Sequence, residues 1–233
     1  MTKQKYTSSL QLPFLFDASK LKSDTDIILK EAWKPHFNTT GYEGDWNSIA
    51  LYAPDGDPEN IIAMGTDEKP FLPTPILDAC EYLKEVLATF ECPFQSVRLM
   101  RLCAGARILP HTDYKSGYED GMFRIHIPIL TNDRVKFILD GQRIIMKPGE
   151  CWYTNVNYEH AVINEGEEDR IHLVIDGVRN EWSDKLFFSL AEKSGFFPVN
   201  EPQYTTEEKA RIIEELERMG TVEAKALIEK LNN

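Results

Sequence analysis

Two histidines and one aspartate in the middle of the sequence have the side chains that bind a divalent metal. His111 and Asp113 lie two residues apart in the segment ILPHTD, and His160 lies in the later segment EHAVIN. Because side chains alternate between the two faces of a β-strand, a strand through ILPHTD carries His111 and Asp113 on one face. Two imidazoles and one carboxylate that converge form the 2-His-1-carboxylate triad, which binds iron(II) and leaves coordination positions open. These three residues are our candidate metal ligands and catalytic residues.

The His-x-Asp pair alone is weak evidence, because such a pair also occurs in solvated loops. Arg170 follows His160 by ten residues and begins the next predicted strand. From there its guanidinium could bind a carboxylate through two parallel hydrogen bonds, a contact that contributes about 1.5–3 kcal/mol. The alternative for Arg170 is a surface salt bridge with the acidic residues 167–169 just before it.

Short strands with tight connections dominate the segment that holds these residues. We expect eight of them, at residues 97–102, 108–113, 123–130, 135–140, 142–147, 151–155, 159–164 and 170–177. Asp140-Gly141 is a hairpin signal, and Pro148-Gly149 marks another turn. The sequence therefore predicts a mainly β, jelly-roll (cupin-like) fold that brings the candidate ligands to opposite walls of one cavity.

Helices are expected on both sides of this β region. Apolar residues recur at steps of three and four over 75–90, which predicts an amphipathic helix with Thr74 as its N-cap and Pro75 at its first position. A strand is expected from Ser48 to Tyr52. Residues 205–220 form a further predicted helix that starts in a capping box, with a short final helix after it. We therefore expect a domain at 1–182 and a helical appendage at 183–233.

Charge and composition exclude some classes of protein. The 233-residue chain has 26 basic and 38 acidic side chains and a formal net charge of −12, so a nucleic-acid partner is not expected. The N-terminus lacks a signal-peptide pattern, and no apolar run reaches the roughly 18 residues of a membrane span. The four cysteines are widely spaced, which favours reduced thiols and a cytoplasmic protein.

Residues 97–182 resemble the aspartyl/asparaginyl β-hydroxylase family of 2-oxoglutarate dioxygenases, and they are also similar to bacterial free-proline hydroxylases. The resemblance is carried, in order, by LPHTD, FRIHIPI, GECWYTN, YEHAVIN and EEDRIHLVIDG. It implies a double-stranded β-helix, Fe(II), 2-oxoglutarate as co-substrate and O2, with ascorbate as the reductant in vitro.

The family pattern also implies roles for single residues. His111 and His160 match its two metal histidines. Arg170 matches the arginine that pairs with the far carboxylate of 2-oxoglutarate. Arg124 and His126 match an Arg-x-His pair that lines the co-substrate pocket, and their spacing puts both on one face of a strand.

Asp113 departs from one branch of the family. The animal peptidyl β-hydroxylases have a glycine at this position, whereas the free amino-acid hydroxylases have the carboxylate that this chain has. The departure puts a direct transfer of a peptidyl Asp/Asn substrate in doubt. It also argues against a halogenase, in which a missing carboxylate vacates a site for chloride.

Three further residues are candidates for substrate binding, namely Trp152 and Asn155, on the strand before His160, and Arg101. Core packing is an equally good interpretation of Trp152. Arg98 and Arg101 fall on opposite faces of their strand, so at most one of them points inward.

Two other histidines are weaker candidates for the site. His172 shares a face with Arg170, and it either lines the cavity or is a hydrogen-bonded core residue. His36 lies outside the β region, and we do not expect it to bind the metal.

Three functions fit the sequence. The first is hydroxylation of an amino acid or an amino-acid-like small molecule at an unactivated C–H bond. The second is hydroxylation of an Asp, Asn or other residue within a peptide or protein. The third is a non-catalytic, cupin-like binding or sensor module. Asp113 together with Arg170 favours an enzyme, and the acidic chain with its helical tail favours a small substrate.

Overall fold

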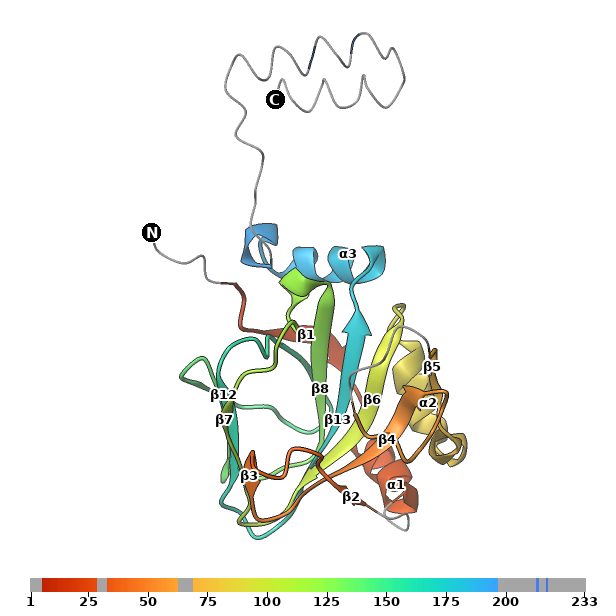
Figure 1. Ribbon diagram of the computed structural model, residues 1–233, viewed down its shortest axis with the longest axis vertical. Helices are drawn as coiled ribbons and strands as arrows, with labels where there is room; N and C mark the ends of the chain where they lie inside the picture. Colours follow the sequence, from red (N-terminus) through yellow and green to blue (C-terminus); the bar gives the residue numbers. More distant parts are fainter. Residues whose placement is uncertain (1–5, 29–32, 63–68, 197–212, 214–216, 218–233) are drawn as a thin grey trace. The chain divides into compact units, whose positions relative to one another are not determined.

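A computed structural model describes residues 6–28, 33–62, 69–196, 213 and 217. The chain divides into two compact units, Met1–Phe197 and Pro198–Asn233 (Figure 1). All elements described below belong to the first unit. The predicted helices over 205–220 and beyond lie outside the described residues, apart from positions 213 and 217, which are helical.

The larger of two antiparallel sheets forms the body of the first unit. Its strand order is β1 (Ser9–Leu15), β11 (Glu150–Thr154), β8 (Met122–Leu130), β13 (Arg170–Val178), β6 (Phe94–Leu102), β4 (Trp46–Pro54) and β2 (Lys34–Pro35), and β5 (Phe71–Pro73) pairs with β4. Neighbouring strands come from distant parts of the chain, as expected when two antiparallel sheets are wound together. The predicted strand at 48–52 is confirmed as part of β4.

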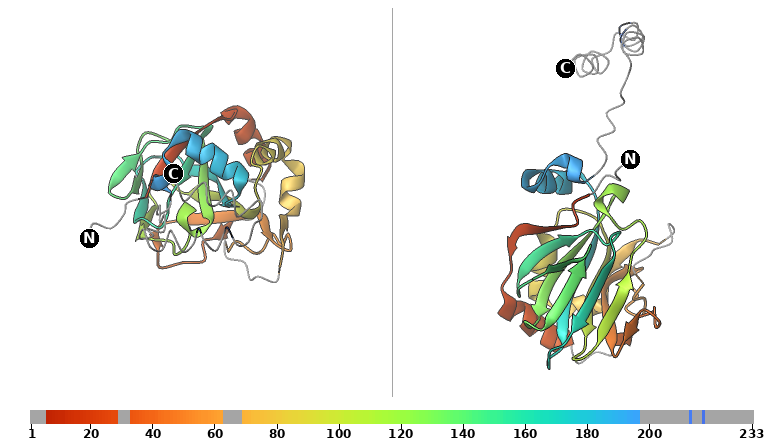
Figure 2. Two further views of the ribbon diagram at one scale, coloured as in Figure 1. Left: turned by 90° about the horizontal axis from the view of Figure 1, so that it is seen from above. Right: turned by 90° about the vertical axis from the view of Figure 1, so that its left-hand side faces the viewer.

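A smaller sheet lies opposite and closes the jelly roll (Figure 2). Its order is β10 (Gln142–Ile144), β9 (Val135–Leu139), β12 (His160–Asn164), β7 (Arg107–His111) and β3 (Tyr42–Glu43). All eight strands predicted between 97 and 177 are present, and the mainly β fold is confirmed. Asp140 and Gly141 have φ values of 51° and 73°, so the β9–β10 hairpin has the two left-handed residues of a type I′ turn.

Two helices lie among the N-terminal strands, before β6, and a third follows the last strand, β13. They are α1 (Ala18–Ile28), α2 (Glu81–Ala88) and α3 (Glu181–Leu190), with 3-10 turns η1 (Pro75–Ala79), η2 (Tyr118–Asp120) and η3 (Lys193–Gly195). The flanking N-terminal helices are confirmed. Among helices in the described part of the chain, none combines the length and apolar character that a membrane crossing requires.

The prediction of a single helix over 75–90 is wrong, because the chain breaks at Cys80 into η1 and α2. The Thr74 hydroxyl donates to the Ala50 carbonyl of β4 and does not cap a helix. Asp24 of α1 supplies the cap instead, since its carboxylate accepts the Leu83 N–H in the first turn of α2 at 2.8 Å. A tertiary contact therefore replaces the local cap that the sequence suggested.

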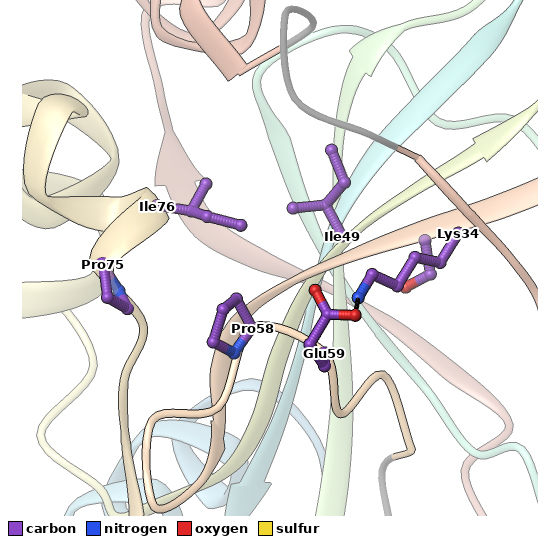
Figure 3. A pocket seen from close by; sticks show the side chains of 7 residues that line it. Lys34, Ile49, Pro58, Glu59, Pro75 and Ile76 are labelled. Carbon is purple, nitrogen blue, oxygen red and sulfur yellow. Dashed lines mark ion pairs between the residues drawn. The ribbon is translucent and has the colours of Figure 1, made fainter.

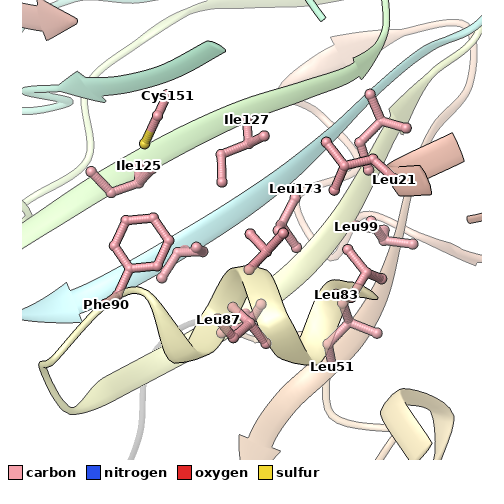
Figure 4. Close-up of a cluster of buried hydrophobic side chains, with 14 of the residues drawn as sticks. Leu21, Leu51, Leu83, Leu87, Phe90, Leu99, Ile125, Ile127, Cys151 and Leu173 are labelled. Atoms are coloured by element: carbon pink, nitrogen blue, oxygen red, sulfur yellow. The ribbon is translucent and has the colours of Figure 1, made fainter. Parts of the chain in front are cut away.

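Apolar side chains fill the face of the large sheet that α1 and α2 cover. Leu83 and Leu87 of α2 point toward Leu99, Ile125 and Leu173 of the central strands (Figure 4). All five side chains are at most 4% exposed. Residues one step along each strand point the other way, toward the small sheet, and it is this second face that carries the polar residues.

Helix α3 packs on the same unit. Phe187 stacks on Tyr118 with ring centroids 4.5 Å apart, and the Tyr118 hydroxyl donates to Asp184 at 2.6 Å. The domain boundary predicted at 182/183 stays a prediction, and it falls within α3.

Candidate metal centre

The structure brings His111, Asp113 and His160 together between the two sheets. One ligand atom from each residue lies within 4.8 Å of the others. His111 ends β7 and pairs directly with His160 at the start of β12, with ring centroids 4.2 Å apart. The predicted placement of the two histidines on opposite walls is therefore wrong, because β7 and β12 are neighbours in the small sheet. Such a group of two imidazoles and a carboxylate is of the size and type that binds one divalent metal.

Backbone carbonyls fix the orientation of both imidazoles. His111 Nδ1 lies 2.8 Å from the Leu109 carbonyl, and His160 Nδ1 lies 3.0 Å from the Tyr158 carbonyl. Because a carbonyl only accepts, each Nδ1 carries the proton and each Nε2 keeps a free lone pair for a metal. Burial, and then the charge of His111, lower the pKa of His160 to about 4, so this ring is neutral as a ligand must be.

The sequence predicted a strand over 108–113, but β7 ends at His111, so Asp113 lies just beyond the strand. Its backbone N–H is held by the Val156 carbonyl, and its Oδ1 lies 3.7 Å from His111 Nε2. Arg124 Nη1 donates to the other oxygen, Oδ2, at 2.5 Å. Burial raises the pKa of Asp113, but Arg124 and then His160 outweigh it and hold the pKa below its usual value. The Asp113 carboxylate is therefore ionised, and Arg124 holds it with Oδ1 toward His111.

A second polar group lies on β8 and β13. Arg170 is 3% exposed, and its Nη2 donates to His172 Nδ1 at 2.9 Å. No described carboxylate pairs with it, and its Nε and the nearby His126 Nδ1 are buried without a hydrogen-bond partner in the described residues. Burial lowers the pKa of Arg170 to about 9, so it remains a cation at neutral pH. A buried cation without an anion, beside an unpartnered imidazole nitrogen, fits a ligand that brings its own carboxylate.

Arg124 and His126 share the sheet face that the family pattern implied. His126 is opposite Trp152 on β11 and Val174 on β13, and its pKa is lowered well below normal by burial and then by Arg170. Arg124 also bonds the buried Asp176 through Nε, at 2.6 Å. Two nitrogens of the Arg124 guanidinium therefore already bond protein carboxylates, those of Asp176 and Asp113, and are not free for the predicted co-substrate contact.

The three predicted substrate residues have different positions. Trp152 lies on the same face as His126, and its indole N–H donates to Glu150. Asn155 is fully buried, and its amide donates to both oxygens of Glu119 and accepts a backbone N–H, so no amide atom that faces a substrate is left over. Arg101 lies over the Trp33 ring on the other face of β6, so the structure does not bring it to the metal ligands.

Arg98 and Asp176 belong to the site, and sequence reasoning did not select them. Arg98 is on the inward face of β6 and bonds Asp176 Oδ2 at 2.8 Å. Asp176 shares its strand face with Arg170 and His172, so the same alternation that selected those residues could have found it.

His36 is also near the site, although it is not part of the group of three ligands. It is 6% exposed and stacks on Trp46 with ring centroids 3.5 Å apart. Burial, and then the charges of Arg98, Asp113 and His111, shift its pKa to about 3. Nothing in the local sequence WKPHFN pointed to this position, because β2 reaches the site only by pairing with β4.

A separate pocket of about 320 Å³ opens at the β2–β4 edge of the large sheet (Figure 3). Ile49 and Ile76 face each other across it, and Lys34 and Glu59 form an ion pair at its side. None of its lining residues is a candidate metal ligand.

The residues present fit the groups that the sequence resemblance implied. The two imidazole Nε2 atoms and Asp113 Oδ1 form a set of nitrogen and oxygen donors suited to Fe(II). His111 and Asp113 are each about 30% exposed at the side chain, which gives the site an open side. The unpaired Arg170, on the facing large sheet, supplies a position for a carboxylate.

Comparisons with known proteins agree with this geometry. The family model for aspartyl/asparaginyl β-hydroxylase matches residues 17–180. The chain is 25% identical over 181 residues to L-proline cis-3-hydroxylase 2 of a Streptomyces species. That alignment covers 73% of this chain but 61% of the relative, so less than two thirds of the relative's length is matched.

Solved structures resemble the chain at lower sequence identity. An oxidoreductase of the 2OG-Fe(II) oxygenase family from Burkholderia pseudomallei shares the fold, with a TM-score of 0.52 at 15% identity, and the match covers 74% of this chain and 86% of the other. A prolyl-4-hydroxylase from Pseudomonas putida gives a TM-score of 0.46 at 13% identity, over 74% of this chain and 94% of the other.

Proposed function

The chain belongs to the aspartyl/asparaginyl β-hydroxylase family, and from this premise we propose that it is an Fe(II)- and 2-oxoglutarate-dependent dioxygenase that hydroxylates a C–H bond. The observation that carries the proposal is the convergence of His111, Asp113 and His160, together with a buried arginine, Arg170, that lacks an anion in the described residues. A binding module would need neither an open metal face nor a site for a second, consumable ligand.

His111 Nε2, His160 Nε2 and Asp113 Oδ1 would hold the metal. When bound, Fe(II) and 2-oxoglutarate would supply the activation of O2, in which the co-substrate is oxidised to succinate and carbon dioxide. The protein contributes fixed ligand orientations, since the Leu109 and Tyr158 carbonyls hold the two imidazoles before any metal arrives.

Arg170 would bind the distal carboxylate of 2-oxoglutarate. Its guanidinium is buried and held at one end by His172, which leaves its Nε without a partner in the described residues. His126 is neutral and carries an unpartnered Nδ1 on the adjacent strand, so it would complete the same pocket. Burial removes water that would otherwise compete for the arginine, which strengthens the contact.

We propose an amino acid or amino-acid-like small molecule as the substrate. The presence of Asp113 and the similarity to a proline hydroxylase support this class. A residue within a peptide is the competing substrate, and the partly exposed side chains of His111 and Asp113 leave room for one.

Succinate formation tests the proposal directly. The purified protein, supplied with Fe(II), ascorbate and 2-oxoglutarate, is incubated with the free amino acids and with Asp- or Asn-containing peptides. We expect succinate together with a product heavier by one oxygen atom. Asp113→Ala should abolish turnover while the melting temperature changes little. Full activity of that variant would refute the carboxylate assignment, and lack of turnover with every candidate would favour a binding module.

A further inference from the structure

Asp176 is a buried carboxylate placed between two buried arginines. Its side chain is 8% exposed, and the side chains of Arg98 and Arg124 are 4% and 14% exposed. Burial raises the pKa of Asp176, but Arg124 and then Arg98 outweigh it and keep the group ionised. A charge so far from water needs complete pairing.

The two oxygens of Asp176 have different partners. Oδ2 accepts from Arg98 Nη2 at 2.8 Å and from the Ser96 hydroxyl at 2.7 Å. Oδ1 accepts from Arg124 Nε at 2.6 Å. Strand pairing fixes this arrangement, because Asp176 on β13 lies directly opposite Ser96 on β6 and Arg124 on β8.

Arg124 links Asp176 to the candidate metal ligand Asp113. One edge of its guanidinium bonds Asp176, and Nη1 bonds Asp113 Oδ2 at 2.5 Å. Since the guanidinium is planar and rigid, fixing it through Nε also fixes the direction of Nη1. With Oδ2 held, the other oxygen of Asp113 is the one directed toward His111 Nε2.

We propose that Asp176 is a positioning residue that acts through Arg124 to aim Asp113 at the metal. The idea rests on the proposed function, and it gives Arg124 a different principal role from the co-substrate contact implied by the family pattern. Asp113 lies past the end of β7, and its backbone N–H bonds the Val156 carbonyl. Backbone carbonyls hold the two imidazole rings, whereas the Asp113 carboxylate is held by Arg124. The hydrogen bonds from Asp176 through Arg124, here called the brace, therefore orient the Asp113 side chain.

Metal affinity, measured without turnover, tests whether Asp176 orients Asp113 through Arg124. Mn(II) is titrated by calorimetry into the anaerobic, metal-free full chain, without 2-oxoglutarate. Loss of an outer-shell partner typically weakens metal binding about 10–100-fold, and we expect a dissociation constant raised by that factor in Asp176→Asn. Ser96→Ala is the matched control, since it removes a partner of Oδ2 and leaves the Oδ1–Arg124 bond, and its affinity should stay within about twofold of the parent protein.

Arg124→Gln separates positioning from charge. Removal of a cation beside Asp113 should by charge alone tighten Mn(II) binding, whereas loss of the brace should weaken it. We expect weaker binding by the same factor as in Asp176→Asn, and no further loss when the two substitutions are combined. Arg124→Lys keeps the charge but lacks the planar guanidinium that bridges Asp176 and Asp113, so this variant should also bind Mn(II) more weakly. These variants keep the Asp176–Arg98 pair, so they serve if Asp176→Asn does not fold.

The outcomes separate this inference from the proposed function. If the parent protein binds Mn(II) and the Asp176 and Arg124 variants bind it equally well, the brace is refuted and the metal site stands. A raised 2-oxoglutarate requirement with unchanged Mn(II) affinity would refute the brace as well and make Arg124 a co-substrate contact. If the parent protein itself binds no Mn(II), both proposals fail.

Discussion

The two faces of the large sheet show how one set of strands serves two purposes. On β13, Ile171, Leu173 and Ile175 face the helices, while Arg170, His172 and Asp176 on the opposite face carry polar groups of the site. The same alternation holds on β8, where Ile125 and Ile127 flank His126. Both faces are buried. The first is apolar, whereas the second combines an apolar cluster that includes Leu102 and Val174 with arginines, imidazoles and a carboxylate.

The difference between the faces lies in what each would gain from ligands. The apolar face is complete in the free chain, because α1 and α2 already cover it (Figure 4). The polar face keeps the Nε of Arg170 and the Nδ1 of His126 unpartnered in the described residues. Unpaired buried polar groups cost stability, so this face should contribute less to folding than its burial suggests and more to ligand binding.

The largest effect is expected from a cavity on the apolar face. Leu173 is fully buried, and Leu173→Ala should destabilise the protein by about 2–5 kcal/mol. Chemical denaturation measures this loss, and Mn(II) affinity of the folded variant should stay unchanged. A variant of wild-type stability that binds metal poorly would contradict the division between the two faces.

Removal of the Arg170 charge should affect ligand binding and leave the stability of the fold intact, the reverse of the Leu173 cavity. Arg170→Met is expected to leave stability unchanged or raise it, because a buried charge without an anion is replaced by an apolar chain. It should raise the half-saturating concentration of 2-oxoglutarate by about one to two decades, equivalent to 1.5–3 kcal/mol. Thermal melts and succinate assays measure the two quantities separately. Marked destabilisation without a change in the 2-oxoglutarate requirement would favour a structural salt bridge instead.

The histidines of the polar face should make the free energy of unfolding fall as the pH is lowered. Burial, and then Arg170, lower the pKa values of His126 and His172 well below normal, and the pKa of His36 falls to about 3. An unfolded chain takes up these protons near pH 6.5 while the folded chain does not, so stability is complete above that pH and falls below it. Each such histidine contributes a slope of up to about 1.4 kcal/mol per pH unit.

Denaturation curves between pH 7.5 and 4.5 check this expectation. His172→Gln should flatten the slope, whereas Leu173→Ala should shift the whole curve down without changing its slope. A stability that is constant down to pH 4.5 would contradict the neutral, buried state of these rings.

The smallest effect concerns the helix layer of the apolar face. Asp24→Ala removes the acceptor for the Leu83 N–H at the start of α2 and should cost about 1 kcal/mol. Asp24→Asn keeps an acceptor and serves as the control. Equal losses for the two variants, measured by denaturation, would show that the charge of Asp24 matters and its cap does not.

Most of the candidate metal centre was predictable because its residues lie on strands with clear alternation. The convergence of His111 and His160 was predicted, but their place on two adjoining strands of one sheet was not, because strand order is a tertiary feature. His36 and Arg98 were not selected, since their proximity to the site depends on how β2 and β6 pair in the large sheet. Asp176 was missed although alternation along β13 would have placed it with Arg170. Asn155 was selected for its place in the sequence, but its neighbours Glu119 and Asn157 occupy its amide.

The amino-acid pattern by itself determined the strand positions, the hairpin at Asp140-Gly141 and the choice of the three candidate metal ligands, because each depends on local spacing and residue type. Only the tertiary structure decided that Arg124 is held between Asp176 and Asp113, and that helix α2 starts at a cap from α1. Both contacts join segments far apart in the chain, and their geometry follows from strand order and helix packing. No local pattern in the sequence encodes those features.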